Sequence, residues 1–156
     1  MSSREHDAAT LKKLLSDDHV EIRKLLGEFL QAVHGNNWAS ADAIFTNLEQ
    51  LITRHIVFEE KDVFPVFADH PELSPGLPLN EMIAQHDVIR KALDDTGIAL
   101  QLHQIREAPM QQLADSIDKH ATAEDAWAAA ALDVVHSHSA AATIFSRLRS
   151  LLTREG

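Results

Sequence analysis

The chain has 156 residues, 45% of them hydrophobic, which is enough for a continuous core, and we expect one globular domain over residues 1–156. Its 14 basic and 24 acidic side chains give a formal net charge of −10, and the basic residues are scattered, which argues against a nucleic-acid partner. The absence of cysteine excludes disulfides, thiolate ligands and iron–sulfur ligation by this chain, and the absence of tyrosine excludes a phenolate ligand.

Apolar residues recur three and four apart through long stretches, without the alternation typical of strands. This periodicity predicts an all-α protein. We expect four long helices and a shorter C-terminal helix packed against them, over about 10–33, 38–68, 79–105, 109–135 and 140–152. The four long helices would form the bundle, at about 10–135.

Turn-forming residues separate the predicted helices. Gly35, Asn36 and Asn37 should stop the first helix, and three prolines within 70–78 should form the longest loop. Pro65 should end or kink the second helix slightly early. Because the other loops are short, neighbouring helices should run antiparallel, as in an up-down-up-down four-helix bundle.

The N-terminal residues lack the basic start and apolar run of a secretory signal. No stretch approaches the roughly 20 consecutive apolar residues of a membrane span. We therefore expect a soluble cytoplasmic protein with no membrane partner.

Two phrases containing histidine each occur twice, in the same order. His19-x-x-Ile22-Arg23-Lys24 returns as His86-x-x-Ile89-Arg90-Lys91, and His55-x-x-x-Glu59-Glu60 returns as His120-x-x-x-Glu124-Asp125. Four successive helices thus supply four imidazoles and two carboxylates, as a buried two-metal site in a helical bundle requires.

The six side chains are predicted to face the interior. In each His-x-x-x-Glu pair the two residues lie four apart, and so on nearly the same face of a helix. Both pairs continue the apolar stripes of their helices, as do His19 and His86. A glutamate buried there without a partner would cost several kcal/mol, and a bound cation removes that penalty.

Each of these histidine motifs, taken alone, has a simpler interpretation that needs no metal. A single histidine on an apolar face is more often a hydrogen-bonded core residue than a ligand, and a lone His-x-x-x-Glu pair is often an ordinary surface pair. The joint pattern favours metal. Nitrogen and oxygen ligands without thiolate suit iron, manganese or zinc, and a carboxylate-bridged pair inside a bundle is the usual setting for two irons. The Glu-x-x-His motif of ferritin-like sites does not occur.

On these motifs, including Asp18 before His19 and Gln85 before His86, the chain resembles the hemerythrin-like, HHE cation-binding family over residues 10 to about 135. The resemblance implies an antiparallel four-helix bundle around an oxygen-bridged non-haem di-iron centre. It also implies four terminal and two bridging ligands, respectively His19, His55, His86 and His120, and Glu59 and Glu124. Oxygen-carrying members have a further histidine where this chain has Arg90, which makes simple oxygen transport an unexpected function.

The leading hypothesis is a di-iron protein that binds or reacts with dioxygen, peroxide or nitric oxide, in oxidative or nitrosative stress or in iron handling. Zinc or manganese could substitute for iron. One alternative is a metal-responsive sensor or iron-donor module without turnover, and another is an interaction-only bundle with structural histidines. Whether the chain is an enzyme stays open at this point.

Other polar residues have weaker patterns. Arg23 and Arg90 could pair with Glu60 or Asp125 around the site, or form ordinary exposed salt bridges. An Asp133-x-x-His136 pair is a weak candidate for a peripheral metal site. The histidines near helix ends or in loops are expected at the surface rather than among the ligands: His34, His70, His103, His136 and His138.

Overall fold

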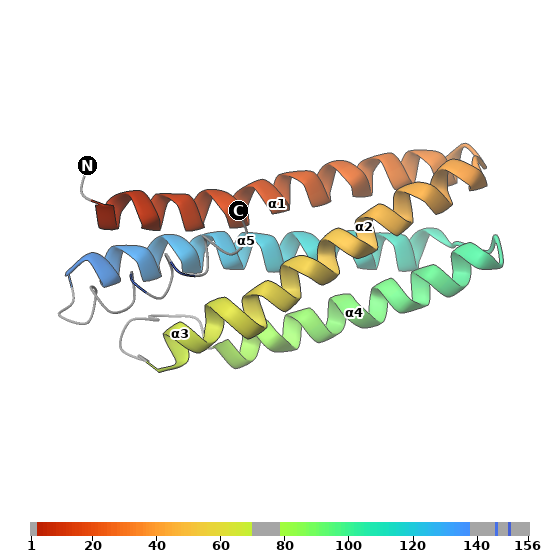
Figure 1. Cartoon of the computed structure of the whole chain (residues 1–156). Helices are drawn as coiled ribbons and strands as arrows, with labels where there is room; N and C mark the ends of the chain where they lie inside the picture. The colour runs from red at the N-terminus through yellow and green to blue at the C-terminus, as the bar shows by residue number, and fades with distance from the viewer. Residues whose placement is uncertain (1–2, 70–78, 138–145, 147–149, 151–156) are drawn as a thin grey trace.

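The computed structural model describes residues 3–69 and 79–137, with Ser146 and Ser150. The elements in chain order are α1 (Ser3–His34), α2 (Trp38–Phe58), the π-helix η1 (Glu59–Val63), α3 (Phe64–Ala68), α4 (Leu79–Gln101) and α5 (Glu107–Ser137). Figure 1 shows the four long helices side by side. Within these ranges the all-helical prediction is confirmed, whereas the predicted helix at 140–152 lies outside the described residues.

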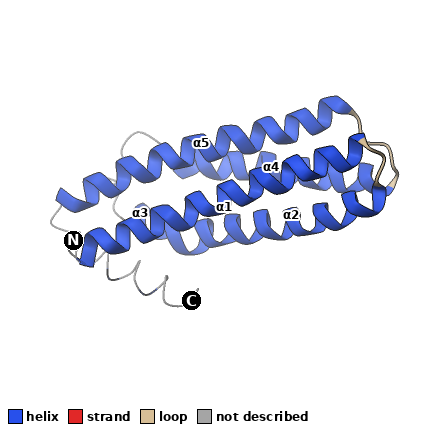
Figure 2. Cartoon of the chain, turned by 90° about the horizontal axis from the view of Figure 1, so that it is seen from above, coloured by secondary structure: helices blue, strands red, loops and turns tan. Residues whose placement is uncertain are grey.

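Each long helix packs against two others. α1 contacts α2 and α5, and α4 contacts the same two helices, so the four helices enclose a common interior. The turns that join α1 to α2 and α4 to α5 lie at the same end of the molecule, and α3 lies at the other end (Figures 1 and 2). The interior therefore receives side chains from four directions along its whole length.

The α1–α2 turn ends the first helix where the sequence predicted. The N–H groups of Gly35, Asn36 and Asn37 donate to carbonyls of the last turn of α1. Asn36 takes the left-handed conformation, with φ of 55°, which asparagine tolerates better than most residues. The side chain of Asn37 then accepts from the Ser40 N–H and caps α2.

The α4–α5 connection begins earlier than expected. α4 ends at Gln101 rather than near residue 105, and His103 has φ of 51°. The Gln104 N–H donates back to the Ala99 carbonyl, as at the end of many helices. The ring of His103 stacks on Trp38 of the neighbouring turn at 4.6 Å, which ties the two turns together.

The second helix changes its hydrogen-bond pattern at Glu59. Residues Glu59–Val63 form η1, and the Phe64 N–H donates to the Glu59 carbonyl, five residues back. α3 then carries Pro65 in its first turn, where the missing N–H costs least. Because a proline clashes with the carbonyl four residues before it, the wider turn accommodates Pro65 without ending the helix. The irregularity thus begins at a predicted site residue rather than at the proline.

The core fills the bundle between the site and the two turns. Its members are apolar side chains from all four long helices, among them Phe29, Phe45, Leu48, Leu93 and Leu113. The rings of Phe29 and Phe45 pack at 5.4 Å. Burial of these apolar surfaces is the main stabilising contribution in this half of the molecule.

Replacing Phe29 by alanine is expected to lower the free energy of unfolding by about 3–5 kcal/mol. The Phe29 side chain is fully buried, so truncation removes its transfer free energy and leaves a cavity that the rigid bundle closes only in part. Denaturant unfolding of the two proteins measures the difference. The exposed Val20→Ala on the same helix is the control, and an equal loss in both variants would contradict this description of the core.

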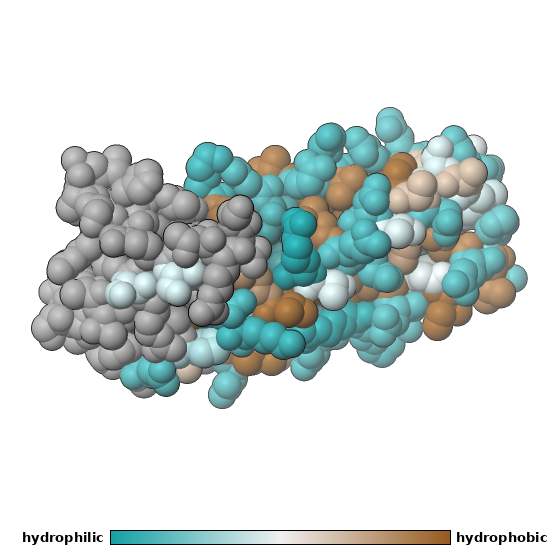
Figure 3. Space-filling model, viewed as in Figure 1, coloured by the Kyte–Doolittle hydropathy of each residue, from teal (hydrophilic) through white to brown (hydrophobic). Residues whose placement is uncertain are grey.

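The face in Figure 3 is mostly hydrophilic where the structure describes it, with hydrophobic residues scattered between. Among the helices of the described residues, none combines the length and apolar character that a membrane span requires.

Candidate metal centre

Four helices and η1 bring the six predicted site residues together inside the bundle. None of the six is more than 4% exposed, and both glutamates are completely buried. Over the described part of the chain, Thr96 is the one other buried polar residue, and its hydroxyl donates to the Ala92 carbonyl of its own helix. Nearly all the buried polar side chains of the described residues therefore lie at one level along the bundle axis.

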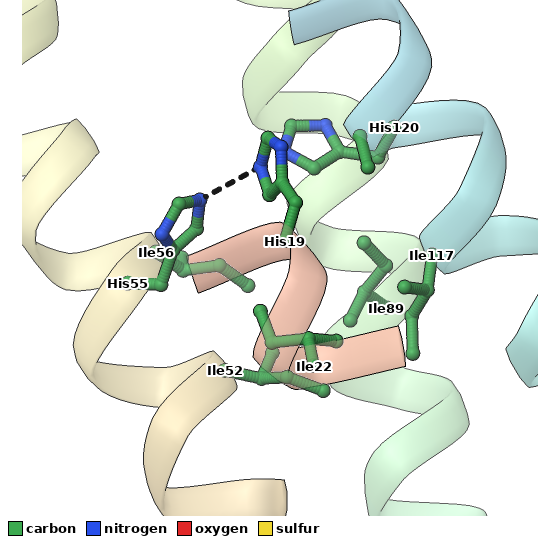
Figure 4. Close-up of a pocket in the computed structure, with 9 residues that line it drawn as sticks. His19, Ile22, Ile52, His55, Ile56, Ile89, Ile117 and His120 are labelled. Atoms are coloured by element: carbon green, nitrogen blue, oxygen red, sulfur yellow. Dashed lines mark hydrogen bonds between the residues drawn. The ribbon is translucent and has the colours of Figure 1, made fainter. Parts of the chain in front are cut away.

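The histidines form two pairs. The first pair is His19 of α1 with His55 of α2, whose Nε2 atoms lie 3.2 Å apart. The second pair is His86 of α4 with His120 of α5, whose Nε2 atoms lie 3.1 Å apart. In Figure 4 the rings of His19, His55 and His120 gather above a layer of isoleucines.

Each glutamate directs its oxygens to both pairs. Oε1 of Glu124 lies 3.0 Å from His19 Nε2 and 3.1 Å from His55 Nε2, while its Oε2 lies 3.1 Å from His120 Nε2. Glu59 contacts His55 through Oε1 and approaches His86 Nε2 to 3.4 Å through Oε2. Two groups of four ligand atoms result, each holding one histidine pair and both glutamates, and within each group all atoms lie within 4.8 Å of one another.

The outer nitrogen of each first-pair histidine is held by an aspartate. His19 Nδ1 lies 3.0 Å from Asp125, and His55 Nδ1 lies 2.8 Å from Asp18. A carboxylate accepts here, so Nδ1 carries a proton, and a ring that loses its second proton presents a bare lone pair at Nε2.

The second pair is held in the same way by different groups. His86 Nδ1 lies 2.9 Å from a Glu60 oxygen, and His120 Nδ1 lies 3.0 Å from the amide oxygen of Gln85. The ring of Phe64, placed by η1, stacks on His86 at 5.7 Å with an interplanar angle of 11°. All four rings are thus oriented with Nε2 toward the interior.

This arrangement fits metal cations. Two ligands at right angles, each about 2.1 Å from a metal, lie about 3.0 Å apart, close to the Nε2 separations in both pairs. Without a cation, two neutral rings with protons on Nδ1 would direct lone pairs at each other. Both oxygens of Glu59 and Oε2 of Glu124 also have no hydrogen-bond partner among the described residues. Buried carboxylate oxygens without donors are costly, and a cation satisfies them.

Protons balance these charges when no metal is bound. Burial, followed by the nearby charge of Glu124, raises the pKa of Glu59 well above its usual range. Burial opposes ionisation of Glu124 too, but its contacts with Glu59 and the histidines outweigh burial and lower its pKa. Burial opposes protonation of His55, yet its bonds to Asp18 and Glu124 and the nearby charge of Glu59 raise its pKa to about 12. Metal binding therefore displaces protons from the site.

The contribution of His86 to the stability of the metal-free protein is expected to fall by about 3 kcal/mol as the pH falls from about 6.5 to about 4. Burial, followed by the charge of His120, lowers the pKa of His86 from 6.5 to about 4. In this window the unfolded chain binds a proton at His86 that the folded chain does not, so acid favours unfolding. Denaturant unfolding across this pH range measures the slope. His86→Asn cannot titrate at this position, so the difference in stability between the two proteins should change by about 3 kcal/mol over this range. A difference that does not depend on pH would contradict the assignment.

One of the two arginines near the site pairs with a residue that holds a histidine, as the sequence suggested. Arg90 forms a two-point pair with Glu60, at 3.0 and 2.7 Å, and so supports the residue that holds His86. Arg23 instead forms an exposed salt bridge with Asp118 at 3.0 Å, two residues before His120, which is the alternative that the sequence left open to a pairing with Asp125 or Glu60. Asp118 is exposed and reaches Arg23 across the contact between α1 and α5.

The other histidines give no support for additional ligands. His34 is exposed and pairs with Glu107 at 3.1 Å, and His103 is exposed and stacks on Trp38. The predictions for His70 and His138, and the side chains of Asp133 and His136, lie outside the part that the structure describes.

The fold and the site together define a helical-bundle protein whose buried histidines and glutamates can hold metal cations. A family model described as Hemerythrin HHE cation binding domain matches residues 10–132, and the chain belongs to this family. Comparison with curated proteins and with solved structures finds no match.

Proposed function

We propose that the protein holds two iron ions and binds or reacts with dioxygen, peroxide or nitric oxide. The observation that carries this proposal is the sharing of both glutamates by the two ligand groups. In this proposal the four histidines are terminal ligands, and Glu59 and Glu124 bridge the metals. Imidazole and carboxylate ligands without thiolate suit iron, with zinc or manganese as possible substitutes.

Two histidines and two bridging carboxylates leave each metal short of six ligands. Bound iron would supply redox chemistry and a place for a small ligand. The protein's own contribution is a set of rings fixed through Nδ1, carboxylates shielded from water, and helices that keep the ligands at one level. Rigid support of this kind is what a site needs to keep its geometry when a ligand arrives.

A small cavity beside the histidines favours a ligand of few atoms. It has a volume of about 20 Å³ and is lined by His19, His55, His120, Ala121 and the five isoleucines labelled in Figure 4. This is little more than the space of one water-sized probe. Dioxygen or nitric oxide is of suitable size, whereas an organic substrate is not, and the isoleucine lining favours an apolar diatomic molecule.

We also infer the up-down-up-down order of helices, a single domain and a cytoplasmic role in oxidative or nitrosative stress or in iron handling. The two short turns at one end of the bundle support the helix order. The small cavity and the iron-suited ligands support the role.

Elemental analysis and optical spectroscopy test the proposal together. The iron-loaded protein should contain two irons per chain, and its reduced form should change spectrum on exposure to dioxygen, peroxide or nitric oxide. His55→Leu should lose both properties, whereas the exposed His34→Leu should keep them. Iron content near zero, or a spectrum unaffected by all three ligands, would contradict the proposal.

A metal-responsive sensor or iron donor is the second candidate. The observation that favours it is that the ligands come from α1, α2 with η1, α4 and α5, so metal occupancy is coupled to the packing of the whole bundle. Metal-dependent melting with no reaction toward the three ligands would favour the sensor over the reactive protein.

A further inference from the structure

The four residues that hold the histidines through Nδ1 are not equivalent. Around the first pair, both are carboxylates, Asp125 behind His19 and Asp18 behind His55. In the ion pairs of the described residues, neither aspartate contacts a lysine or arginine. Two carboxylates without a direct ion pair to lysine or arginine thus stand behind the first pair.

The residues that hold the second pair carry less negative charge. Glu60 holds His86, but it forms a two-point ion pair with Arg90, which also contacts Asp87 at 3.1 Å. Gln85 holds His120 with a neutral amide, although it occupies the place in the repeat that Asp18 occupies in the first copy. The two histidine pairs are alike in geometry but differ in the residues that hold them: two carboxylates without a basic partner for the first pair, and one arginine-paired carboxylate and one amide for the second.

A carboxylate behind a histidine makes the ring a stronger donor to a metal, and loss of such a partner commonly costs 10–100-fold in metal affinity. The negative charge behind the first pair also attracts the cation directly, whereas the Glu60–Arg90 ion pair and the neutral Gln85 attract it less. Both effects favour the position at His19 and His55, while the two glutamates belong to both ligand groups.

We infer that the two metal positions differ in affinity: the position at His19 and His55 fills first, and Gln85 weakens the position at His86 and His120. This inference rests on the proposed two-metal function. It predicts a species with one metal per chain. It also predicts that the position at His86 and His120 loses its metal first.

Crystals of the full chain, freed of metal and then given one equivalent of Co²⁺, test the order by anomalous diffraction. The first position should show about 10-fold or more of the occupancy of the second. Gln85→Glu restores the carboxylate present in the first copy and should bring the two occupancies close to equal. Gln50→Glu adds the same charge at an exposed site of α2 and should leave the ratio unchanged.

A second variant tests the same order of affinities if Gln85→Glu fails to fold. Asp18→Asn removes a charge behind His55 and should also narrow the ratio, by weakening the first position. Calorimetric titration with Co²⁺ gives the two affinities of each variant independently of any reaction. Equal occupancies in the unmodified protein, or a ratio unchanged in both variants, would overturn the inference while leaving the two-metal proposal intact. Absence of Co²⁺ from both positions would overturn both.

Discussion

Chelation of the bound cations is expected to lower the free energy of unfolding by about 4 kcal/mol for each position held at about 1,000 times its dissociation constant. The expected loss is large because the ligands come from all four long helices, so the unfolded chain cannot reproduce the site. Denaturant unfolding of the loaded and the chelated protein, in the same buffer, measures it.

A control must show that the loss of stability comes from removal of metal from this site and not from another effect of the chelator. The double variant His55→Leu with His120→Leu lacks a ligand at each position, so it should unfold at nearly the same denaturant concentration with and without chelator. Equal stability of the loaded and chelated forms of the unmodified protein would show that the cations do not join the helices.

Replacing both buried glutamates by glutamine should have opposite effects on the two forms. The metal-free protein is expected to gain about 1–3 kcal/mol, because both oxygens of Glu59 lack hydrogen-bond donors and burial, with the nearby charge of Glu124, opposes ionisation of this side chain. The same variant, Glu59→Gln with Glu124→Gln, should lose the metal-dependent stabilisation, because an amide oxygen carries no charge to neutralise a cation.

A charge-matched variant separates these effects from the change in net charge. Glu28→Gln with Glu49→Gln removes two charges from exposed positions of α1 and α2 and should alter neither quantity by more than about 0.5 kcal/mol. Destabilisation of the metal-free protein by the double change at Glu59 and Glu124 would indicate that these carboxylates stabilise the fold by themselves.

The six candidate ligands could be predicted from sequence because helix periodicity is a strong constraint. A residue four positions after a histidine shares its face, and an apolar stripe on both sides requires that face to point inward. Their positions in adjacent helices followed from the order of the two copies. The turn at Gly35–Asn37 was predictable for a similar reason, since its residue types favour few other conformations.

The supporting residues were harder to predict. Asp18, Glu60, Gln85 and Asp125 stood in the quoted motifs, but their roles depend on which ring each one reaches across the bundle. The residue before the first histidine of a copy holds the second histidine of that copy, while the residue after the glutamate holds a histidine of the other copy. The sequence signal for these four residues was that they recur next to the ligands. That signal does not indicate which histidine each residue contacts in the folded protein.

The π-helix was not predictable from local sequence. Pro65 signalled an irregularity in the second helix, but the widened turn lies at Glu59–Val63 and places Phe64 on His86. Its position depends on how aromatic residues from α3 and α5 pack, as where Trp127 meets Phe67 at 5.1 Å. Such contacts depend on the assembled fold rather than on the order of neighbouring residues.

Anomalous diffraction from crystals of the iron-loaded protein, collected at the iron absorption edge, tests the central claim most directly. Two peaks are expected inside the bundle, one within bonding distance of each Nε2 pair and both in contact with Glu59 and Glu124. A map with no peak at these side chains, or with iron bound only at the surface, would contradict the account.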